Sequence, residues 1–428
     1  MSGFFALLGL VRAGFTAPSF AIFTDLMTGW VCAPGRRTIT AMITVADPAG
    51  ARAHDAYHRF VRDGAWCMHR LWQALATHLV TRYAPAGAIE LACDDTLFHH
   101  QGHKVDGAGA FRDAVRSTVG KVVYARGLNL VVITLQVRPP WGGCPIAVPI
   151  DMRVHRKKDT VTTIGHAAAM LTQIVGWLPG RSIHLTADGA YATLARDLPA
   201  GVHLTCRMRR DAALFEPAPP RTGKRGRPRT KGQRLPTPAR LSATLPARAF
   251  TTIEADTRGR SVTKLVHVTD VLWYAVDKTN LVRLVIVRDP DRVEPDDYFF
   301  TTDLHATAVE VVARYAARWA IEVCFRDTKQ DLGGQNPQSW KRQGPERAAA
   351  LSLWLHAATW CWYLDTHPDG QGFTPRPWYR HKTTPSFLDA LAALRRALWS
   401  QRITAMTHSE PDNTKITDAI LDTLAYAA

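Results

Sequence analysis

Two apolar segments that each end in aspartate constrain the fold of this chain more than any other feature. Residues 89–95 read IELACDD, and residues 181–188 read RSIHLTAD. The other elements expected around them are strands at 127–137 and 144–154, a helix at 160–180 and a strand at 202–209. Strands that alternate with helices in this order predict a mixed α/β core rather than a β-sandwich.

The acids at the two strand ends are Asp94 and Asp95 in the first segment and Asp188 in the second. A carboxylate beside a buried strand is costly to desolvate unless it binds a cation or hydrogen-bond donors. The carboxyl ends of strands are also where open α/β sheets place their chemistry. Either Asp94 or Asp95 can complete the first position, because neighbouring residues of a strand point to opposite faces.

A long helix is expected from about residue 306 to residue 330. At about 100° per residue, four polar side chains fall within an arc of about 60° on one face. They are Tyr315, Arg318, Glu322 and Lys329. A stripe like this can be an ordinary exposed charge ladder, but the strand-end aspartates favour a site to which the helix adds a third carboxylate.

Three carboxylates suit a hard cation such as Mg²⁺, which prefers oxygen ligands. Two such ions roughly 3.5–4 Å apart can activate a water or a 3′ hydroxyl and stabilise the leaving oxygen of a phosphodiester. Mn²⁺ is expected to substitute for Mg²⁺. On the same helix face, Arg318 and Lys329 are expected to hold a DNA backbone, Arg318 through its planar fork and Lys329 as a point charge.

The charge of the chain favours a polyanionic partner. Its 428 residues carry 53 Lys and Arg against 37 Asp and Glu, a formal net charge of +16. Such an excess of positive charge favours binding to a phosphate backbone, whereas an enzyme that acts on small metabolites does not need it. No apolar run approaches the roughly 20 residues of a membrane-spanning helix, and no signal peptide is recognised. The seven cysteines form no CxxC pair, which favours a reducing cytoplasm, and the bacterial nucleoid is the expected location.

Composition divides the chain into five expected parts. These are a helical DNA-binding domain (1–85), a first part of the core (86–210), a β-rich basic insertion (211–287), a second part of the core (288–365) and a helical C-terminal region (366–428). For the first part, a packed helical bundle without DNA contacts is an equal alternative. We expect the core to be closed by a nearly all-apolar helix at residues 345–364.

The insertion begins with a Pro-, Gly- and Arg-rich stretch that contains GKRGRPR. This wording is similar to short segments that lie in an AT-rich minor groove, although a solvated basic loop explains it equally well. The arginines expected to contact DNA here and after the strand at 202–209 are Arg225, Arg227, Arg229, Arg207 and Arg210. The histidines of HHQGH (His99, His100 and His103) suggest zinc only weakly, because no further ligand is obvious nearby.

The sequence motif of the expected helix resembles that of a known family. Tyr315, Arg318, Glu322 and Lys329 match the Y-R-E-K signature of bacterial insertion-sequence transposases of the DDE class. CDDT (93–96) and TADGAY (186–191) look like the two aspartate motifs of that family. A β-rich insertion between the second aspartate and the glutamate is similar as well.

The resemblance implies a ribonuclease-H-like fold, cut-and-paste transposition and a metal-binding catalytic triad of Asp95, Asp188 and Glu322. It favours Asp95 because the family's first aspartate usually precedes a small polar residue, here Thr96, but Asp94 stays a rival. Members with this helix commonly form hairpin DNA ends and take up a flipped base on an aromatic of the insertion. Trp273 is the candidate for that aromatic, with a place in the core of the insertion as the alternative.

The sequence therefore predicts a DNA transposase that binds transposon ends and cuts and joins strands with two Mg²⁺ ions. Its expected partners are inverted-repeat ends, target DNA and a second copy of the chain in the synaptic complex. Two alternatives stay open, a metal-dependent nuclease of the same fold without strand transfer and a catalytically silent DNA-binding protein.

Overall fold

The computed structural model describes residues 3–113, 115–118, 120–220 and 229–409. Ten strands form one sheet in the order β2-β3-β1-β5-β6-β10-β9-β8-β7, and β4 pairs with β3. The strands are β1 (Ile89–His99), β2 (Gly109–Arg112), β3 (Tyr124–Val137), β4 (Ile146–His155), β5 (Ile183–Ala187), β6 (Val202–Arg207), β7 (Thr251–Asp256), β8 (Ser261–Val271), β9 (Val282–Arg288) and β10 (Asp297–Thr301).

The core of the sheet follows the predicted mixed α/β pattern. Strands β1, β3 and β4 pair antiparallel, and β5 and β6 run parallel to β1. The parallel strands are reached through α6 (Thr163–Trp177) and η2 (Gly189–Arg196). The connection after Asp188, η2, is a 3₁₀ helix, a tighter form common in short connections.

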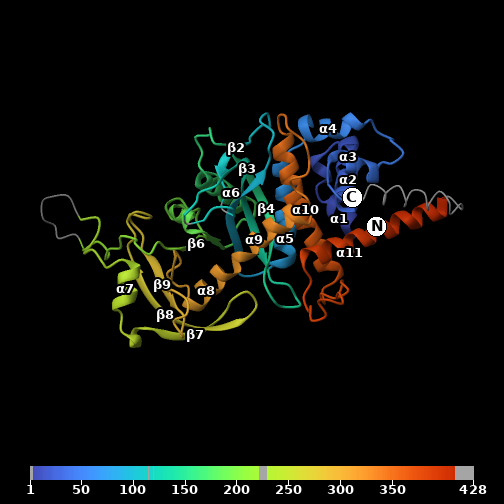
Figure 1. Ribbon diagram of the computed structural model, residues 1–428. Helices are drawn as coiled ribbons and strands as arrows, with labels where there is room; N and C mark the ends of the chain where they lie inside the picture. The colour runs from blue at the N-terminus through green and yellow to red at the C-terminus, as the bar shows by residue number, and fades with distance from the viewer. Residues whose placement is uncertain (1–2, 114, 119, 221–228, 410–428) are drawn as a thin grey trace.

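The insertion extends the same sheet instead of forming a sheet of its own. Strand β10 pairs with β6 on one side and with β9 on the other, so β7, β8 and β9 continue the core sheet outward. In Figure 1 these strands form a lobe with α7 (Pro238–Thr244). One side of this lobe packs beneath α8 (Ala308–Ala317) through a small apolar cluster that includes Val285 and Val311.

The expected long helix is divided at Arg318 into α8 and α9 (Trp319–Gln330). Arg318 keeps α-helical dihedral angles, and the N–H of Ile321 donates to its carbonyl three residues back, as in a 3₁₀ turn. Because this irregularity is only one tightened turn, the two helices remain roughly in line (Figure 1).

Helices from both ends of the chain share one apolar core with the sheet. The remaining helices are α1 (Gly3–Gly9), η1 (Arg12–Gly14), α2 (Ala17–Cys32), α3 (Ile39–Ala46), α4 (His54–Asp63), α5 (Met68–Tyr83), η3 (Ala247–Ala249), α10 (Gly344–Thr366) and α11 (Phe387–Ser409). Helix α10 is buried on nearly every side, as its composition predicts, and α1, α4, α5 and α11 pack on it. The N-terminal helices are therefore a bundle joined to the main core.

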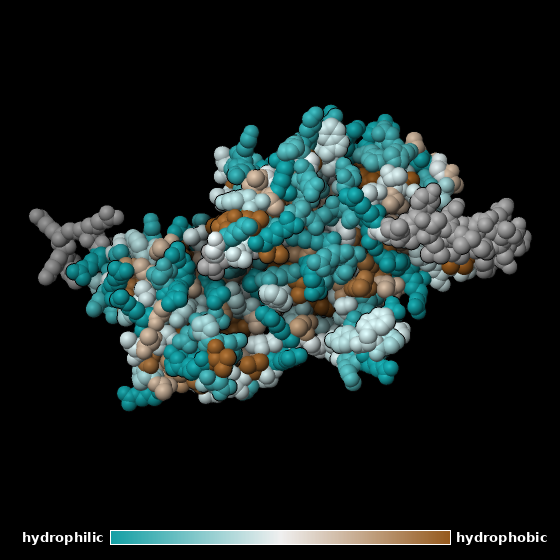
Figure 2. Space-filling view, viewed as in Figure 1, coloured by the Kyte–Doolittle hydropathy of each residue, from teal (hydrophilic) through white to brown (hydrophobic). Residues whose placement is uncertain are grey.

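Hydrophilic side chains cover most of the face seen in Figure 2, with scattered hydrophobic patches. In the part of the chain that the structure describes, no helix has both the length and the apolar character needed to cross a membrane.

Candidate nuclease active site

The pairing of β1 with β5 brings the two aspartate motifs together. Cys93 is level with Ala187 in this parallel pair, so the residues that follow lie at the same level: Asp94 within β1, which continues to His99, and Asp188 directly after the end of β5. Residues level with each other in a parallel pair point to the same face of the sheet. Asp94 and Asp188 are therefore neighbours on one face, and the charge of Asp188 helps to raise the pKa of Asp94.

Helices α8 and α9 lie along this face and contact every second residue of β1. We call this the helix-facing side of β1. Each of three β1 residues, spaced by two or four positions as the pleat requires, bonds to one cation of the helices. The pairs are Glu90 with Arg314 (3.1 Å), Asp94 with Arg318 (2.9 Å) and Thr96 with Lys329 (2.6 Å).

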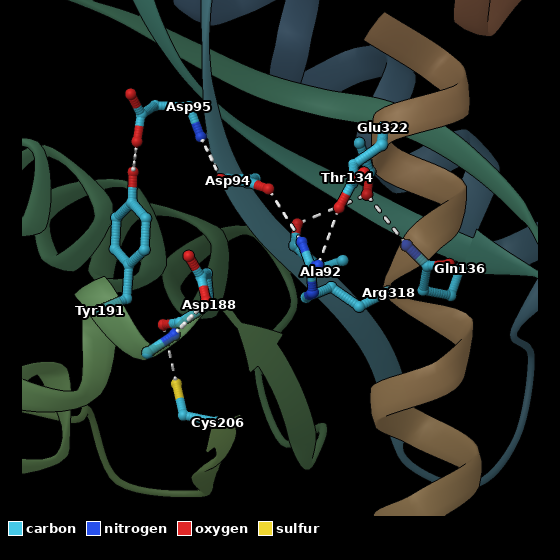
Figure 3. A network of polar contacts seen from close by, with 11 residues as sticks. Ala92, Asp94, Asp95, Thr134, Gln136, Asp188, Tyr191, Cys206, Arg318 and Glu322 are labelled. Atoms are coloured by element: carbon cyan, nitrogen blue, oxygen red, sulfur yellow. Dashed lines mark hydrogen bonds and ion pairs between the residues drawn. The ribbon is translucent and has the colours of Figure 1, made fainter. Parts of the chain in front are cut away.

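Arg318 joins the strand to the third predicted carboxylate. One guanidinium nitrogen lies 2.9 Å from Asp94 Oδ2 and another lies 2.8 Å from Glu322 Oε1. The Arg318 side chain is only 12% exposed, so its charge is directed at these carboxylates and not at solvent. Figure 3 shows Arg318 beside Asp94, with Asp188 on the neighbouring segment.

The ionised form of Asp94 is disfavoured by its surroundings, and a nearby positive charge would stabilise it. Its pKa is raised to about 7: burial is the largest cause, Arg318 and the backbone N–H of Asp95 lower the pKa, and the charges of Asp95 and Asp188 raise it. One arginine shared with Glu322 thus does not offset the burial of this group. A divalent cation at this position would favour the ionised form far more strongly.

Asp95 lies on the opposite side of β1. The hydroxyl of Tyr191, in η2, donates a 3.0 Å hydrogen bond to Asp95 Oδ1. Tyr191 is buried, whereas Asp95 is exposed. The structure thus brings Asp94, Asp188 and Glu322 to one side and leaves Asp95 outside this group (Figure 3).

Two family descriptions match the chain across this site. The model described as "DDE superfamily endonuclease" matches residues 13–264, which is more than half of the chain and includes both aspartate motifs. The chain belongs to the DDE superfamily endonucleases. A second model, described as "Archaeal putative transposase ISC1217", matches residues 242–350, which include Glu322 and the rest of the four-residue column. No curated protein matches the chain.

Membership in the DDE endonucleases confirms the ribonuclease-H-like fold predicted from the sequence and makes the chain a nuclease-type enzyme. The match to a transposase model over α8 and α9 supports a transposase-like nuclease. Divalent metals are the usual cofactors of DDE endonucleases. The oxygen-only donor set of Asp94, Asp188 and Glu322 fits such ions by its chemistry.

The three carboxylates are spread apart around Arg318. Among the described residues, the single group of three His, Cys, Asp or Glu ligand atoms within 4.8 Å of one another lies elsewhere. The oxygens of Asp94, Asp188 and Glu322 therefore do not converge on one point. Like charges separate unless a cation holds them, and here the guanidinium of Arg318 fills that role for two of the three.

The two other members of the four-residue column are half-buried. Lys329 donates to Thr96 and lies 5.8 Å from the centre of the Phe98 ring, and burial lowers its pKa to about 8. Tyr315 packs against Phe299, with ring centres 4.3 Å apart. The column faces the strand carboxylates, so the expected contacts of Arg318 and Lys329 with a DNA backbone are not the contacts that these side chains make here.

Trp273 occupies the core position that was the alternative to a base-binding role. It is 5% exposed, and its ring meets Phe300 edge-on at 5.3 Å. A flipped base cannot stack on it without local opening of the core. The aromatic near Glu322 that is open to solvent is Trp319, which is 44% exposed and has the Arg258 guanidinium 4.6 Å from its ring centre.

The predicted DNA-contacting arginines have different surroundings. Arg207 is exposed and pairs with Asp297 at 2.6 Å, and Arg210 and Arg229 are also exposed. Arg225 and Arg227 lie outside the described residues. Exposure at these positions is compatible with DNA contact but is also typical of any surface arginine.

The HHQGH histidines do not form part of a metal-ligand group within the described ranges. His99 Nε2 instead lies 2.9 Å from Asp113 Oδ2. Sequence reasoning missed two members of the site, Glu90 and Arg314. The sequence contained a signal for Glu90. Every second residue of a half-buried strand shares a face, and Glu90 precedes Asp94 by four positions, so the two lie on the same face.

Proposed function

We propose that this chain is a DNA transposase whose metal-binding carboxylates are Asp94, Asp188 and Glu322. The observation that carries the assignment is the bridge from Asp94 through Arg318 to Glu322, at the level of Asp188. This bridge brings together Asp94 and Glu322, which are 228 positions apart in sequence, and Asp188 lies beside Asp94. The proposed triad differs from the triad that the resemblance implies by one residue, Asp94 in place of Asp95.

Two Mg²⁺ ions held by these carboxylates would activate a water or the 3′ hydroxyl of a DNA strand as nucleophile and stabilise the leaving oxygen of the phosphodiester. Asp94, level with Asp188, is the residue of β1 placed to share a cation with it. Glu322, on the first turn of α9, completes the oxygen set from above the sheet. Once the carboxylates hold metal, the Arg318 fork is free to turn to a phosphate oxygen.

A transposase also binds DNA at surfaces away from its catalytic carboxylates. An arginine-lined pocket of about 800 Å³ is suited to such binding. It lies between the α4–α5 connection and the start of α10, and four arginines line it (Arg62, Arg70, Arg342 and Arg347). Asp63 is the acid among its lining residues and pairs with both Arg62 and Arg342. Arg70 is exposed there, so a phosphate backbone can reach it.

Cleavage and joining are measured on DNA that carries both ends of the genomic segment encoding the chain, with Mg²⁺ or Mn²⁺. We expect hairpin-ended or nicked end fragments and joined products from the wild type, and none from Glu322→Gln. Cleavage without joined product would favour the nuclease alternative. End binding by the wild type without any cleavage would favour the silent DNA-binding protein and would contradict the proposal.

The pocket and the expected pairing of two copies are tested by binding. Arg70→Ala should weaken binding to any DNA sequence and lower the slope of log affinity against log salt by about 1. Arg292→Ala, at an exposed turn between β9 and β10, is the matched control and should change neither. A complex that holds two end fragments and two copies of the chain, measured by its mass, is expected for synapsis.

A further inference from the structure

A second group of ligand side chains lies between α5 and α10. It consists of a ring nitrogen of His78, the Sγ atom of Cys361 and a carboxylate oxygen of Asp365, all within 4.8 Å of one another. His78 belongs to α5, and Cys361 and Asp365 stand four residues apart on α10. Side chains with this spacing lie on one face of a helix, so α10 presents both to α5.

The histidine of this group has an unused ring nitrogen. His78 Nε2 is shielded from solvent and has no hydrogen-bond partner. A buried polar atom without a partner is rare and calls for an explanation.

The other two ligands have weak or movable partners. The Tyr83 hydroxyl lies 3.3 Å from Cys361 Sγ and 3.0 Å from Asp365 Oδ1. Arg82 donates to the same carboxylate oxygen, but its side chain is 60% exposed. Arg82 does not block an ion, because it lies at the solvent end of the group and can turn away. Tyr83 does not need either ligand atom, because its hydroxyl also lies 3.0 Å from the carbonyl oxygen of Cys361 and can donate to it instead.

We propose that His78, Cys361 and Asp365 bind a borderline-soft transition-metal ion, with Zn²⁺ as the expected one and water as the fourth ligand. Ligand atoms around tetrahedral zinc are roughly 3.5 Å apart, so separations of no more than 4.8 Å contract by about 1.3 Å at most. Binding replaces the proton of the Cys361 thiol, which leaves to solvent, with a metal–thiolate bond. The ion fastens the N-terminal bundle to the buried helix α10.

This site differs in chemistry from the nuclease site. A thiolate and an imidazole select Zn²⁺ or Co²⁺ over Mg²⁺, whereas the oxygen set of Asp94, Asp188 and Glu322 suits Mg²⁺. The two sites also lie on different helices, α5 and α10 here and α9 there. The proposal therefore stands whether or not the chain moves DNA.

The test is titration of the metal-free full-length protein with Co²⁺ while excess Mg²⁺ occupies the nuclease site. We expect a near-ultraviolet thiolate-to-cobalt absorption band that reaches a plateau at one equivalent, disappears when Zn²⁺ displaces Co²⁺, and is accompanied by a rise in melting temperature. Cys361→Ser should abolish the band. Cys67→Ser, which removes an exposed thiol elsewhere, should leave it unchanged.

Asp365→Asn guards against a folding defect, because Asp365 is at the surface and its loss does not disturb the core. It should lower Co²⁺ affinity roughly tenfold or more, as losses at metal sites usually do. No band in the wild type, or a band that survives Cys361→Ser, would overturn the proposal. Loss of the band in Cys206→Ser, near Asp188, would assign it to the nuclease site and overturn the proposal as well.

Discussion

The two sides of strand β1 carry adjacent aspartates with opposite surroundings. On the helix-facing side, Asp94 is largely buried, its pKa is raised to about 7, and it shares Arg318 with Glu322. On the other side, Asp95 is exposed and accepts one hydrogen bond from Tyr191. The difference shows that proximity in sequence to a motif is a weaker guide to chemistry than the face on which a side chain lies.

Substitution of the two aspartates separates the two sides most strongly. Asp94→Asn should lower metal-dependent strand cleavage by about 10³-fold or more, on the scale of removing a group on which a transition state depends. Asp95→Asn keeps an acceptor for Tyr191 and should retain most of the activity. Equal loss in both variants, with both folded by circular dichroism, would contradict the assignment of Asp94.

The same contrast between a buried and an exposed position distinguishes two tryptophans. Trp273→Ala should lower the free energy of unfolding by about 3–5 kcal/mol, because it empties a core position against Phe300. Trp319→Ala should change stability by no more than about 0.5 kcal/mol, since the ring is partly in solvent. Chemical denaturation measures both values.

DNA binding is the second property in which the two tryptophans, Trp273 and Trp319, should differ. A base that stacks on an accessible ring contributes about 1–3 kcal/mol. We therefore expect Trp319→Ala, and not Trp273→Ala, to weaken binding of end DNA by the folded protein. A folded Trp273→Ala variant that cleaves DNA but forms no hairpin ends would instead support the base-binding role predicted for Trp273.

The helix-facing side should also give cleavage a characteristic pH dependence. Because the pKa of Asp94 without metal is raised to about 7, protons compete with Mg²⁺ for this carboxylate below that pH, and at a subsaturating Mg²⁺ concentration the rate should fall by up to about tenfold per pH unit. Because the pKa of Lys329 is lowered to about 8, its positive charge is lost above that pH. Cleavage should therefore be fastest between about pH 7 and pH 8.

Lys329→Arg tests the alkaline limb separately, since arginine stays charged throughout this range. The fall above pH 8 should disappear while the acidic limb remains. A profile that is unchanged in this variant would assign the alkaline limb to another group. The measurement is single-turnover cleavage of end DNA at constant ionic strength.

Much of the fold could be predicted from local sequence patterns. The side of β1 on which each aspartate lies could not. Strands β1, β3, β4, β5 and β6 and the buried helix α10 were predicted from apolar runs, and the column of Arg318, Glu322 and Lys329 from helical periodicity. These signals are local. The choice between Asp94 and Asp95 depends on pairing with β5, nearly a hundred residues away in sequence, which the order of residues in β1 does not contain.

Other differences from the sequence reasoning also arise from long-range packing. The ion pair of Arg318 with Asp94 is one example, because no pattern within the helix shows that β1 brings Asp94 to 2.9 Å from this arginine. The contact of Arg318 with DNA stays a prediction. Trp273 lies two residues after the end of β8, and its burial against Phe300 appears only when β10 joins β9 to β6. The 3₁₀ helix after Asp188 keeps Tyr191 close enough to reach Asp95.

The smallest expected effect concerns the hydrogen bond on the far side of β1. Burial, above all, raises the pKa of Tyr191, so its hydroxyl stays protonated and donates to Asp95. Tyr191→Phe removes this donor but leaves Asp95 free to bond with water, because Asp95 is exposed. We expect a loss of about 0.5–1 kcal/mol in the free energy of unfolding, the lower part of the range for one hydrogen bond, with cleavage and its pH profile unchanged. A Tyr191→Phe variant that is as stable as wild type but cleaves DNA poorly would place Asp95, rather than Asp94, in the chemistry.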